Sequence, residues 1–205
     1  MYQKMFAVGN SLTCGFGNHG MASTTVETDW FYHVVEGLRA KNPEMQAIRA
    51  TRGGWEGEET SEARRQILAE VIEPMLEPGI DLVLIQLGDN VNTDERRTTF
   101  REDAAEMIRW FREKCPGARV IWIYGWYNME DNMELLKGAL ADVNGELADI
   151  SHHSPFPEHR NVLGGRYIGG DGEEHIIESV GVASHPNDLG MKKIAETVLE
   201  TIFGE

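Results

Sequence analysis

The sequence predicts a single α/β domain built around a mostly parallel sheet. Short apolar runs at 5–8, 80–87 and 120–124 are typical of buried strands, and they alternate with segments of helical periodicity. Glycine and proline separate these segments, and no internal repeat, linker or low-complexity stretch interrupts them. The 205 residues fit one domain with a sizeable core, so residues 1–205 are interpreted as one unit.

In the first half of the chain, four elements follow one another. The run at 5–8 predicts a strand that ends at Gly9, and Asp29 is expected to cap a helix that continues to about residue 40. A weaker alternation at 46–51 predicts a second strand. Thr60 or Ser61 then begins a helix that is stopped before the prolines at 74 and 78.

The second half begins with the clearest strand of the sequence. Residues 80–87 are apolar at nearly every position, as expected of a central parallel strand covered on both faces. A capping box of Thr99 and Glu102 predicts the next helix. After these come a strand at 120–124, a helix at 133–148 weakened by two glycines, an irregular loop at 151–184, and a last helix capped by Asn187 or Asp188.

The charge balance limits the partners of this chain. Lysine and arginine total 19 against 34 aspartates and glutamates, a net charge of −15, which disfavours nucleic acid and anionic membrane surfaces. No apolar run approaches the ~20 residues that span a bilayer, and no leader pattern is seen. Two cysteines form no disulfide framework, so a cytoplasmic location is expected, although a secreted chain trimmed of its leader would look the same. The oligomeric state is not predicted.

Polar residues suited to acyl transfer gather where the predicted strands end. Ser11 follows the first strand, glycines at 53–57 follow the second, and Asn90 follows the third, while His185 precedes the last helix. Because ligands bind at the carboxyl ends of parallel strands, these residues are expected to meet in one crevice. Acyl transfer needs a nucleophile, a base and donors aimed at the oxyanion, which Ser11, His185, backbone N–H groups and the Asn90 amide supply.

Four short motifs resemble those of a known family. The sequence GNSL at 9–12 resembles the GDSL signature, with Asn10 in place of the usual aspartate, and GWEG at 54–57, GDN at 88–90 and HPND at 185–188 resemble its later blocks in the same order. The chain is therefore similar to the SGNH hydrolase superfamily of esterases, lipases, thioesterases and carbohydrate deacetylases.

The resemblance implies a flavodoxin-like three-layer α/β/α fold and a set of site residues. It implies Ser11 as nucleophile, His185 as base, and an oxyanion hole from Ser11, Gly57 and Asn90, with Gly54 as the competing glycine. The simpler interpretations are that Ser11 only caps a helix, Asn90 only closes a turn and His185 is an ordinary loop residue.

One position departs from the family. Val182 occupies the place, three residues before the histidine, where the family usually has the triad aspartate. A main-chain carbonyl from 181–184 or a loop carboxylate (Asp171, Glu174 or Glu178) would have to support His185 instead, and we favour the carbonyl because it is already local. Asp188 is expected to cap the last helix.

The other candidate residues are one cysteine, four histidines and two aromatic residues. Cys14 is expected to pack as a small apolar group. The histidines at 152, 153, 159 and 175 match no metal-ligand spacing, so neither a metal nor another cofactor is expected. Trp126 and Tyr127, after a strand end, are predicted to line an acyl or sugar pocket.

These observations favour a serine esterase that acts on a small-molecule ester. An acetyl ester, on a carbohydrate, fits the absence of a lipid-binding segment and the aromatic and polar residues of the loops. A thioesterase or lysophospholipase of the same family is the alternative hydrolase. A non-catalytic ligand-binding member is the rival from another class, raised by Val182.

Overall fold

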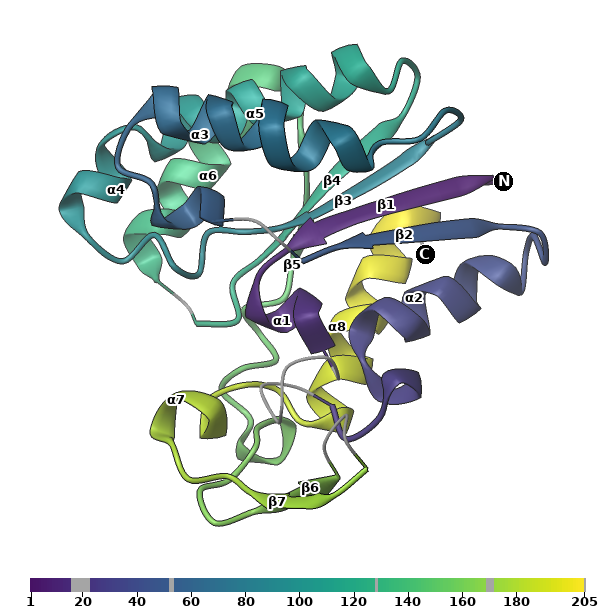
Figure 1. Cartoon of the computed structure of the whole chain (residues 1–205), viewed down its shortest axis with the longest axis vertical. Helices are drawn as coiled ribbons and strands as arrows, with labels where there is room; N and C mark the ends of the chain where they lie inside the picture. Colours follow the sequence, from purple (N-terminus) through teal and green to yellow (C-terminus); the bar gives the residue numbers. More distant parts are fainter. Residues whose placement is uncertain (16–22, 52–53, 128, 169–171, 205) are drawn as a thin grey trace.

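The computed structural model describes residues 1–15, 23–51, 54–127, 129–168 and 172–204, and its centre is a five-stranded parallel sheet (Figure 1). The strand order is β2-β1-β3-β4-β5, which is the flavodoxin-like order of doubly wound folds. The strands are β1 Lys4–Gly9, β2 Gln46–Ala50, β3 Leu82–Gln86, β4 Arg119–Tyr124 and β5 Glu146–Asp149. The predicted fold class is confirmed.

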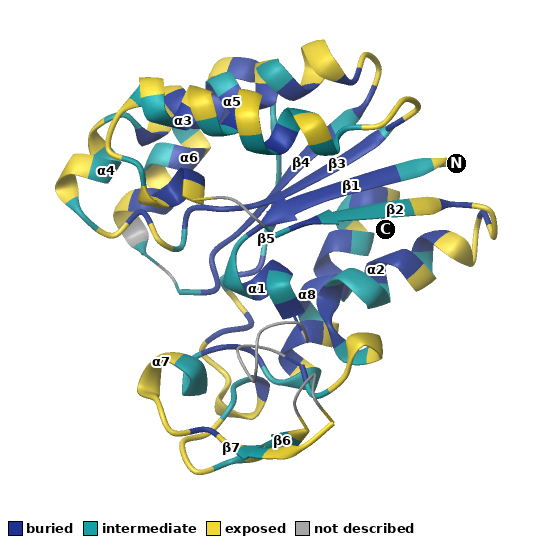
Figure 2. Ribbon diagram, in the orientation of Figure 1, coloured by how far each residue is buried: buried dark blue, intermediate teal, exposed yellow. Residues whose placement is uncertain are grey.

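Helices cover both faces of this sheet and complete three layers (Figure 1). On one face lie α2 (Trp30–Arg39) and α8 (Asp188–Phe203), and on the other lie α3 (Ser61–Ile67), α5 (Phe100–Lys114) and α6 (Glu130–Val143). Successive residues of a strand point to opposite faces. In β1, therefore, Met5 and Ala7 pack in one core cluster and Phe6 and Val8 in the other. This double burial explains why the sequences of β1, β3 and β4 are nearly continuous apolar runs, whereas β2 and β5 at the edges are less buried (Figure 2).

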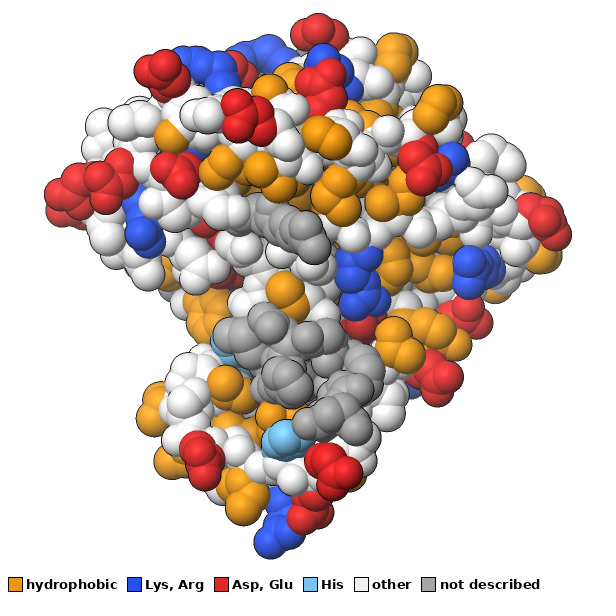
Figure 3. All heavy atoms as spheres, viewed as in Figure 1, with side chains coloured by type: hydrophobic (Ala, Val, Ile, Leu, Met, Phe, Trp, Pro, Cys, Tyr) orange, Lys and Arg blue, Asp and Glu red, His pale blue; other side chains and the backbone are white. Residues whose placement is uncertain are grey.

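Short elements make the connections. They are α1 (Ser11–Cys14), η2 (Val26–Thr28), η3 (Gly54–Gly57), η4 (Leu68–Ile72), η5 (Glu73–Met75), α4 (Asp94–Thr98), η6 (Pro157–His159), β6 (Arg166–Ile168), β7 (Glu174–Ile176) and α7 (Val180–Ala183). The segment predicted as an irregular loop contains η6, α7 and an antiparallel β6–β7 hairpin, and it forms a lobe beyond the carboxyl ends of the strands (Figure 1). The molecule narrows between this lobe and the body that holds the sheet (Figure 3).

Two predicted elements differ from the structure. The helix expected at 133–148 ends at Val143, because Asn144 takes a left-handed conformation with φ of 48° and the chain then turns into β5, the edge strand beside β4. Thr99 makes no capping hydrogen bond, because α4 leads directly into α5 and the Thr99 hydroxyl accepts a hydrogen bond from Arg64 instead. In the described part of the chain, no helix is long and apolar enough to cross a membrane.

A buried ion pair joins α3 to α5, and its arginine also bonds η3. Arg64 is 1% exposed and its guanidinium donates to the Asp103 carboxylate at 2.7 Å and to the Trp55 carbonyl at 3.2 Å. The same group lies over the Trp55 ring, 4.7 Å from its centroid. The loop that carries residues 54–57 is thereby fixed to the helical layer, because a buried charge must keep its partners.

We expect Arg64→Met to lower the free energy of unfolding by about 3–5 kcal/mol, since it leaves the Asp103 carboxylate buried without its partner. Denaturant unfolding measures this change. Arg65→Met is the matched control, because Arg65 pairs with Glu106 at the surface and such pairs contribute about 0–1 kcal/mol. Equal losses in the two variants would contradict this assignment.

Candidate active site

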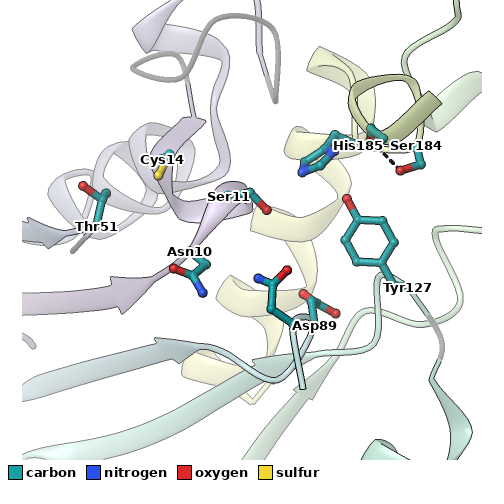
Figure 4. A pocket seen from close by; sticks show the side chains of 10 residues that line it. Asn10, Ser11, Cys14, Thr51, Asp89, Tyr127, Ser184 and His185 are labelled. Carbon is teal, nitrogen blue, oxygen red and sulfur yellow. Dashed lines mark hydrogen bonds between the residues drawn. The ribbon is translucent and has the colours of Figure 1, made fainter. Parts of the chain in front are cut away.

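A polar cavity of about 540 Å³ opens at the carboxyl end of the sheet (Figure 4). Its walls come from the segments that follow β1, β2, β3 and β4 and from the segment before α8, where ligands bind in open α/β folds. The lining residues are Asn10, Ser11, Cys14, Thr51, Asp89, Asn90, Tyr127, Gly181, Ser184 and His185. The cavity thus brings together four of the predicted site residues, namely Ser11, Asn90, Tyr127 and His185.

Ser11 begins α1 directly after β1. The turn between them is tight: a Cβ on Gly9 would lie 2.0 Å from the Thr13 hydroxyl oxygen and 2.7 Å from the Gln86 carbonyl oxygen. Only glycine fits so close an approach of backbone and side chain. The turn places the Ser11 side chain in the cavity, across from the His185 imidazole (Figure 4).

His185 is held by the main chain, as the sequence suggested. Its Nδ1 lies 2.7 Å from the Gly181 carbonyl oxygen, and because a carbonyl only accepts, Nδ1 carries the proton. Nε2 then keeps its lone pair; it is buried and has no hydrogen-bond partner among the described residues. Burial lowers the pKa of His185, although the Gly181 hydrogen bond opposes this, so the imidazole is a neutral base at neutral pH.

The loop carboxylates that were considered as partners of His185 lie elsewhere. Glu174 pairs with Arg166 on the hairpin, Glu178 is exposed, and Asp171 falls outside the described residues. Asp188 does not cap α8: its carboxylate accepts from the Thr24 backbone at 2.7 Å and hydroxyl at 2.6 Å.

Of the two residues considered for the cap of α8, Asn187 takes that role. Its side chain accepts from the Gly190 backbone N–H at 3.0 Å. The one-turn helix α7 is capped in the same way by Ser179, whose hydroxyl accepts from Val182. These caps fix both ends of the segment that carries His185.

Glu56 is the residue that the sequence analysis missed. It is 0% exposed, and its carboxylate accepts hydrogen bonds from the backbone of Gly88, the backbone and side-chain amide of Asn90, and the side-chain amide of Asn10. Glu56 therefore ties η3 to the ends of β1 and β3. The sequence signal for it is an acidic residue, Glu56, between Trp55 and Gly57 in a predicted loop. The sequence analysis used only the glycines of this stretch.

Three predicted positions do not line the cavity. Gly57 and Gly54 are exposed in η3, and neither is among the described residues that line the cavity. Trp126 is fully buried in the core beneath α8, because its large apolar ring packs there. Its indole N–H donates to the Ser184 carbonyl at 2.9 Å, so it supports the residue next to His185 and not a substrate.

The comparisons with known proteins identify the family of this chain. The model of the GDSL-like lipase/acylhydrolase family matches residues 7–193. This chain belongs to that family. It is an ester-bond hydrolase by family, and among curated proteins none matches it in sequence.

Solved structures show the same fold at low identity. This hydrolase is similar to a lipase from a goat rumen metagenome (15% identity, TM-score 0.58, covering 96% of this chain and 95% of that one). It is also similar to a carbohydrate acetylesterase from Sinorhizobium meliloti (14%, TM-score 0.60, 98% and 99%). A third similar structure is a carbohydrate esterase family 2 enzyme with a carbohydrate-binding domain from Corynascus thermopiles (12% identity, TM-score 0.60, covering 98% of this chain and 66% of that one).

Other reactive groups of this hydrolase have structural explanations. Cys14 lines the cavity, but burial raises the pKa of its thiol, against the opposing effects of Arg49 and Thr51, so it stays protonated. His153 is buried against Thr197, and burial lowers its pKa to about 4. Among the residues that the structure describes, no group of histidine, cysteine or carboxylate side chains is arranged to hold a metal ion.

We expect nitrogen NMR to find the His185 imidazole as the Nδ1–H tautomer with a pKa below its ordinary value, because the ring is buried and Nδ1 donates to Gly181. The His185→Gln variant identifies the resonances by their loss. An Nε2–H tautomer, or a pKa above the ordinary value, would contradict the main-chain support described above.

Proposed function

We propose that this protein is a serine esterase that hydrolyses a small acyl ester, an acetyl group on a carbohydrate being the best fit, with Ser11 as nucleophile and His185 as base. The observation that carries the proposal is the shared cavity, where the Ser11 hydroxyl faces an imidazole whose proton is fixed on Nδ1 and whose Nε2 is unpartnered. A base oriented in this way can accept the serine proton.

The reaction would proceed in two acyl-transfer steps. His185 Nε2 takes the Ser11 proton while the oxygen attacks the ester carbonyl, and the protonated imidazole then gives that proton to the leaving alcohol. Water, activated by the same Nε2, hydrolyses the acyl-serine and regenerates the free serine. The Gly181 carbonyl keeps the Nδ1 proton in place throughout, so the pair acts as a dyad.

Asn90 is the side chain proposed to stabilise the oxyanion, together with the Ser11 backbone N–H. The Asn90 amide group has two N–H donors, and Glu56 accepts one of them at 3.0 Å. The other donor is left for the substrate. Because Glu56 also holds the Asn90 backbone, at 3.2 Å, the amide is oriented before substrate arrives, which is what effective oxyanion stabilisation requires.

The chemistry of the cavity supports a small, polar and uncharged ester. Its described lining consists mainly of hydroxyl, amide and carboxyl groups with one tyrosine, and it includes neither lysine nor arginine. None of these residues has a large aliphatic side chain that would pack along a long acyl chain, and none offers a lysine or arginine to a phosphate-bearing leaving group. Similarity in fold to carbohydrate esterases points the same way, whereas a thioester of a phosphorylated carrier fits less well.

A set of p-nitrophenyl esters of increasing acyl length, followed by acetylated sugars, tests this substrate class. We expect kcat/KM to be highest for acetate and to fall as the chain lengthens, because the described lining of the cavity includes no leucine, isoleucine, valine, methionine or phenylalanine to pack along a long acyl chain. Labelling by a fluorophosphonate probe reports the nucleophile separately. A protein that neither turns over these esters nor reacts with the probe would be a binding module, and the proposal would be wrong.

Ser11→Ala is expected to abolish turnover and probe labelling and to leave the melting temperature nearly unchanged, because the hydroxyl makes no hydrogen bond on which the described fold depends. Loss of the nucleophile in such a unit costs several orders of magnitude in kcat, up to about 10⁶. Turnover retained in a purified Ser11→Ala preparation would remove Ser11 from the mechanism.

Glu56→Gln should reduce kcat by about 10–100-fold with KM little changed. In the wild type, N–H donors face the Glu56 carboxylate; the glutamine would direct its own N–H group at one of them, and Asn90 would lose its orientation. Steady-state kinetics measure the two constants. Glu59→Gln, which neutralises an exposed carboxylate three residues away, is the matched control and should behave as the wild type. A change in KM alone would place Glu56 in ground-state binding.

A further inference from the structure

Two acidic side chains lie close to Asn90: Asp89 lines the cavity, and Glu56 is buried behind it, and their hydrogen bonding differs sharply. Glu56 accepts from Gly88, Asn10 and twice from Asn90, so N–H donors fill the roughly four lone-pair sites of its carboxylate. A proton on Glu56 would face one of these donors. This carboxyl group is therefore built to be ionised, even though burial raises its pKa against the opposing hydrogen bonds.

Asp89 has the opposite surroundings. One oxygen, Oδ2, accepts from the Gln86 side-chain amide at 2.8 Å, and Gln86 is itself fixed by the Thr13 hydroxyl at 3.0 Å. The other oxygen, Oδ1, is buried and has no hydrogen-bond partner among the described residues. A bare carboxylate oxygen in such a place is costly, whereas an O–H there is much less so.

Apart from hydrogen bonds from Gln86 and the Tyr127 backbone, the groups around Asp89 do not stabilise its negative charge. The charge of Glu56 on η3 opposes a second negative charge on Asp89. The hydroxyls of Tyr124 and Tyr127, from the β4 side, are buried and have no hydrogen-bond partner among the described residues. The ring of His185 lies against Tyr127, with centroids 5.6 Å apart, and stays neutral. The cations of this region, Arg97 and Arg160, act on Tyr124 and Tyr127 respectively.

We propose that Asp89 is a positioning residue that serves the proposed esterase as a neutral acid, and that its ionisation turns the reaction off. Asp89 directly precedes Asn90, the proposed oxyanion donor, and both line the same cavity as Ser11. Figure 4 shows Asp89 in this cavity. While Asp89 keeps its proton, Glu56 is the one charged member of this pair of acids, and its charge is surrounded by N–H dipoles. A second, uncompensated negative charge would oppose the oxyanion that forms next to it.

The titration of Asp89 agrees with this assignment. Burial and then the charge of Glu56 raise the pKa of Asp89 to about 8, against smaller opposing effects of hydrogen bonds from the Tyr127 backbone and Gln86. The neutral form therefore predominates at and below neutral pH. The inference depends on the proposed esterase activity for its effect on rate, but the protonation state of Asp89 is a separate, measurable property.

The pH dependence of kcat with p-nitrophenyl acetate, from about pH 5.5 to about pH 10, tests the role in catalysis. We expect the wild-type kcat to fall as pH rises through about 8. The asparagine of Asp89→Asn is an uncharged analogue of the protonated aspartic acid. Its carbonyl oxygen would accept from Gln86, and its N–H₂ group would occupy the position of the acid O–H. The variant should keep kcat within about tenfold at pH 7 and lose the alkaline fall, because no group is left to ionise.

Asp94→Asn is the matched control, since Asp94 is an exposed aspartate at the start of α4 and its neutralisation should leave the alkaline fall in place. An alkaline fall that persists in Asp89→Asn would assign it to another group and overturn the proposal. An Asp89→Asn variant that melts like the wild type but is inactive at every pH would show that the ionised carboxylate is needed, and would overturn it equally.

Carbon NMR of protein labelled at the aspartate carboxyl groups decides the protonation state without any turnover. The resonance missing from Asp89→Asn should titrate near 8. A midpoint near the ordinary aspartate value of about 3.9 would overturn the proposal even if the enzyme is active. If the wild type hydrolyses no ester, the proposed function fails, while this titration still reports whether Asp89 is a neutral acid.

Discussion

The carboxylate of Glu56 is the interaction on which the candidate site depends. A charge that is 0% exposed is expensive to bury, and it is tolerated only where hydrogen bonds replace the lost water. Here the replacements come from Asn10 after β1 and from Gly88 and Asn90 after β3. Satisfying one charge therefore fixes two strand ends relative to each other, and these strand ends carry Ser11 and the proposed oxyanion amide.

The support for Glu56 extends into the helical layer. Trp55, its neighbour in η3, is buried against Phe100 and Trp122, and the Arg64 guanidinium bonds its carbonyl while pairing with Asp103 of α5. The element η3, which follows the weakest predicted strand, is thus held by buried contacts to α3 and α5. This explains why a one-turn element with two exposed glycines presents a buried acid so precisely.

The parts of the fold that the sequence predicts well are those with local signals. Continuous apolar runs identified β1, β3 and β4, and the caps at Asp29 and Thr60 begin helices as expected. The edge strand β5 was missed because it is only four residues long and its sequence continues a helical pattern, so that the left-handed turn at Asn144 decides the outcome. The β6–β7 hairpin was missed for a similar reason, since short strands in a glycine-rich segment carry little periodicity.

In the site, too, the residues with local sequence motifs were predicted and those that depend on distant contacts were not. Ser11, Asn90 and His185 were predicted from motifs at strand ends, and the main-chain partner of His185 followed from Val182, which has no side chain to accept a hydrogen bond. Glu56 and the burial of Trp126 were not predictable in this way, because both depend on contacts between segments distant in sequence. Trp126 is an example: its strand-end position suggested a ligand contact, but the core beneath α8 accommodates its ring.

The electrostatics of the cavity place a limit on how it can stabilise an oxyanion. A carbonyl partner for His185 fixes the tautomer but brings no full negative charge to stabilise the imidazolium, so the site relies more on donors at the oxyanion. Those donors lie beside Glu56, whose charge would work against them if it were bare. Four N–H dipoles directed at Glu56 reduce the effect of its charge on the oxyanion. The other acid, Asp89, lines the cavity and has no comparable set of donors among the described residues. The arrangement is consistent only if the two acids differ in protonation, one ionised to hold the donors in place and the other neutral so that the donors can act.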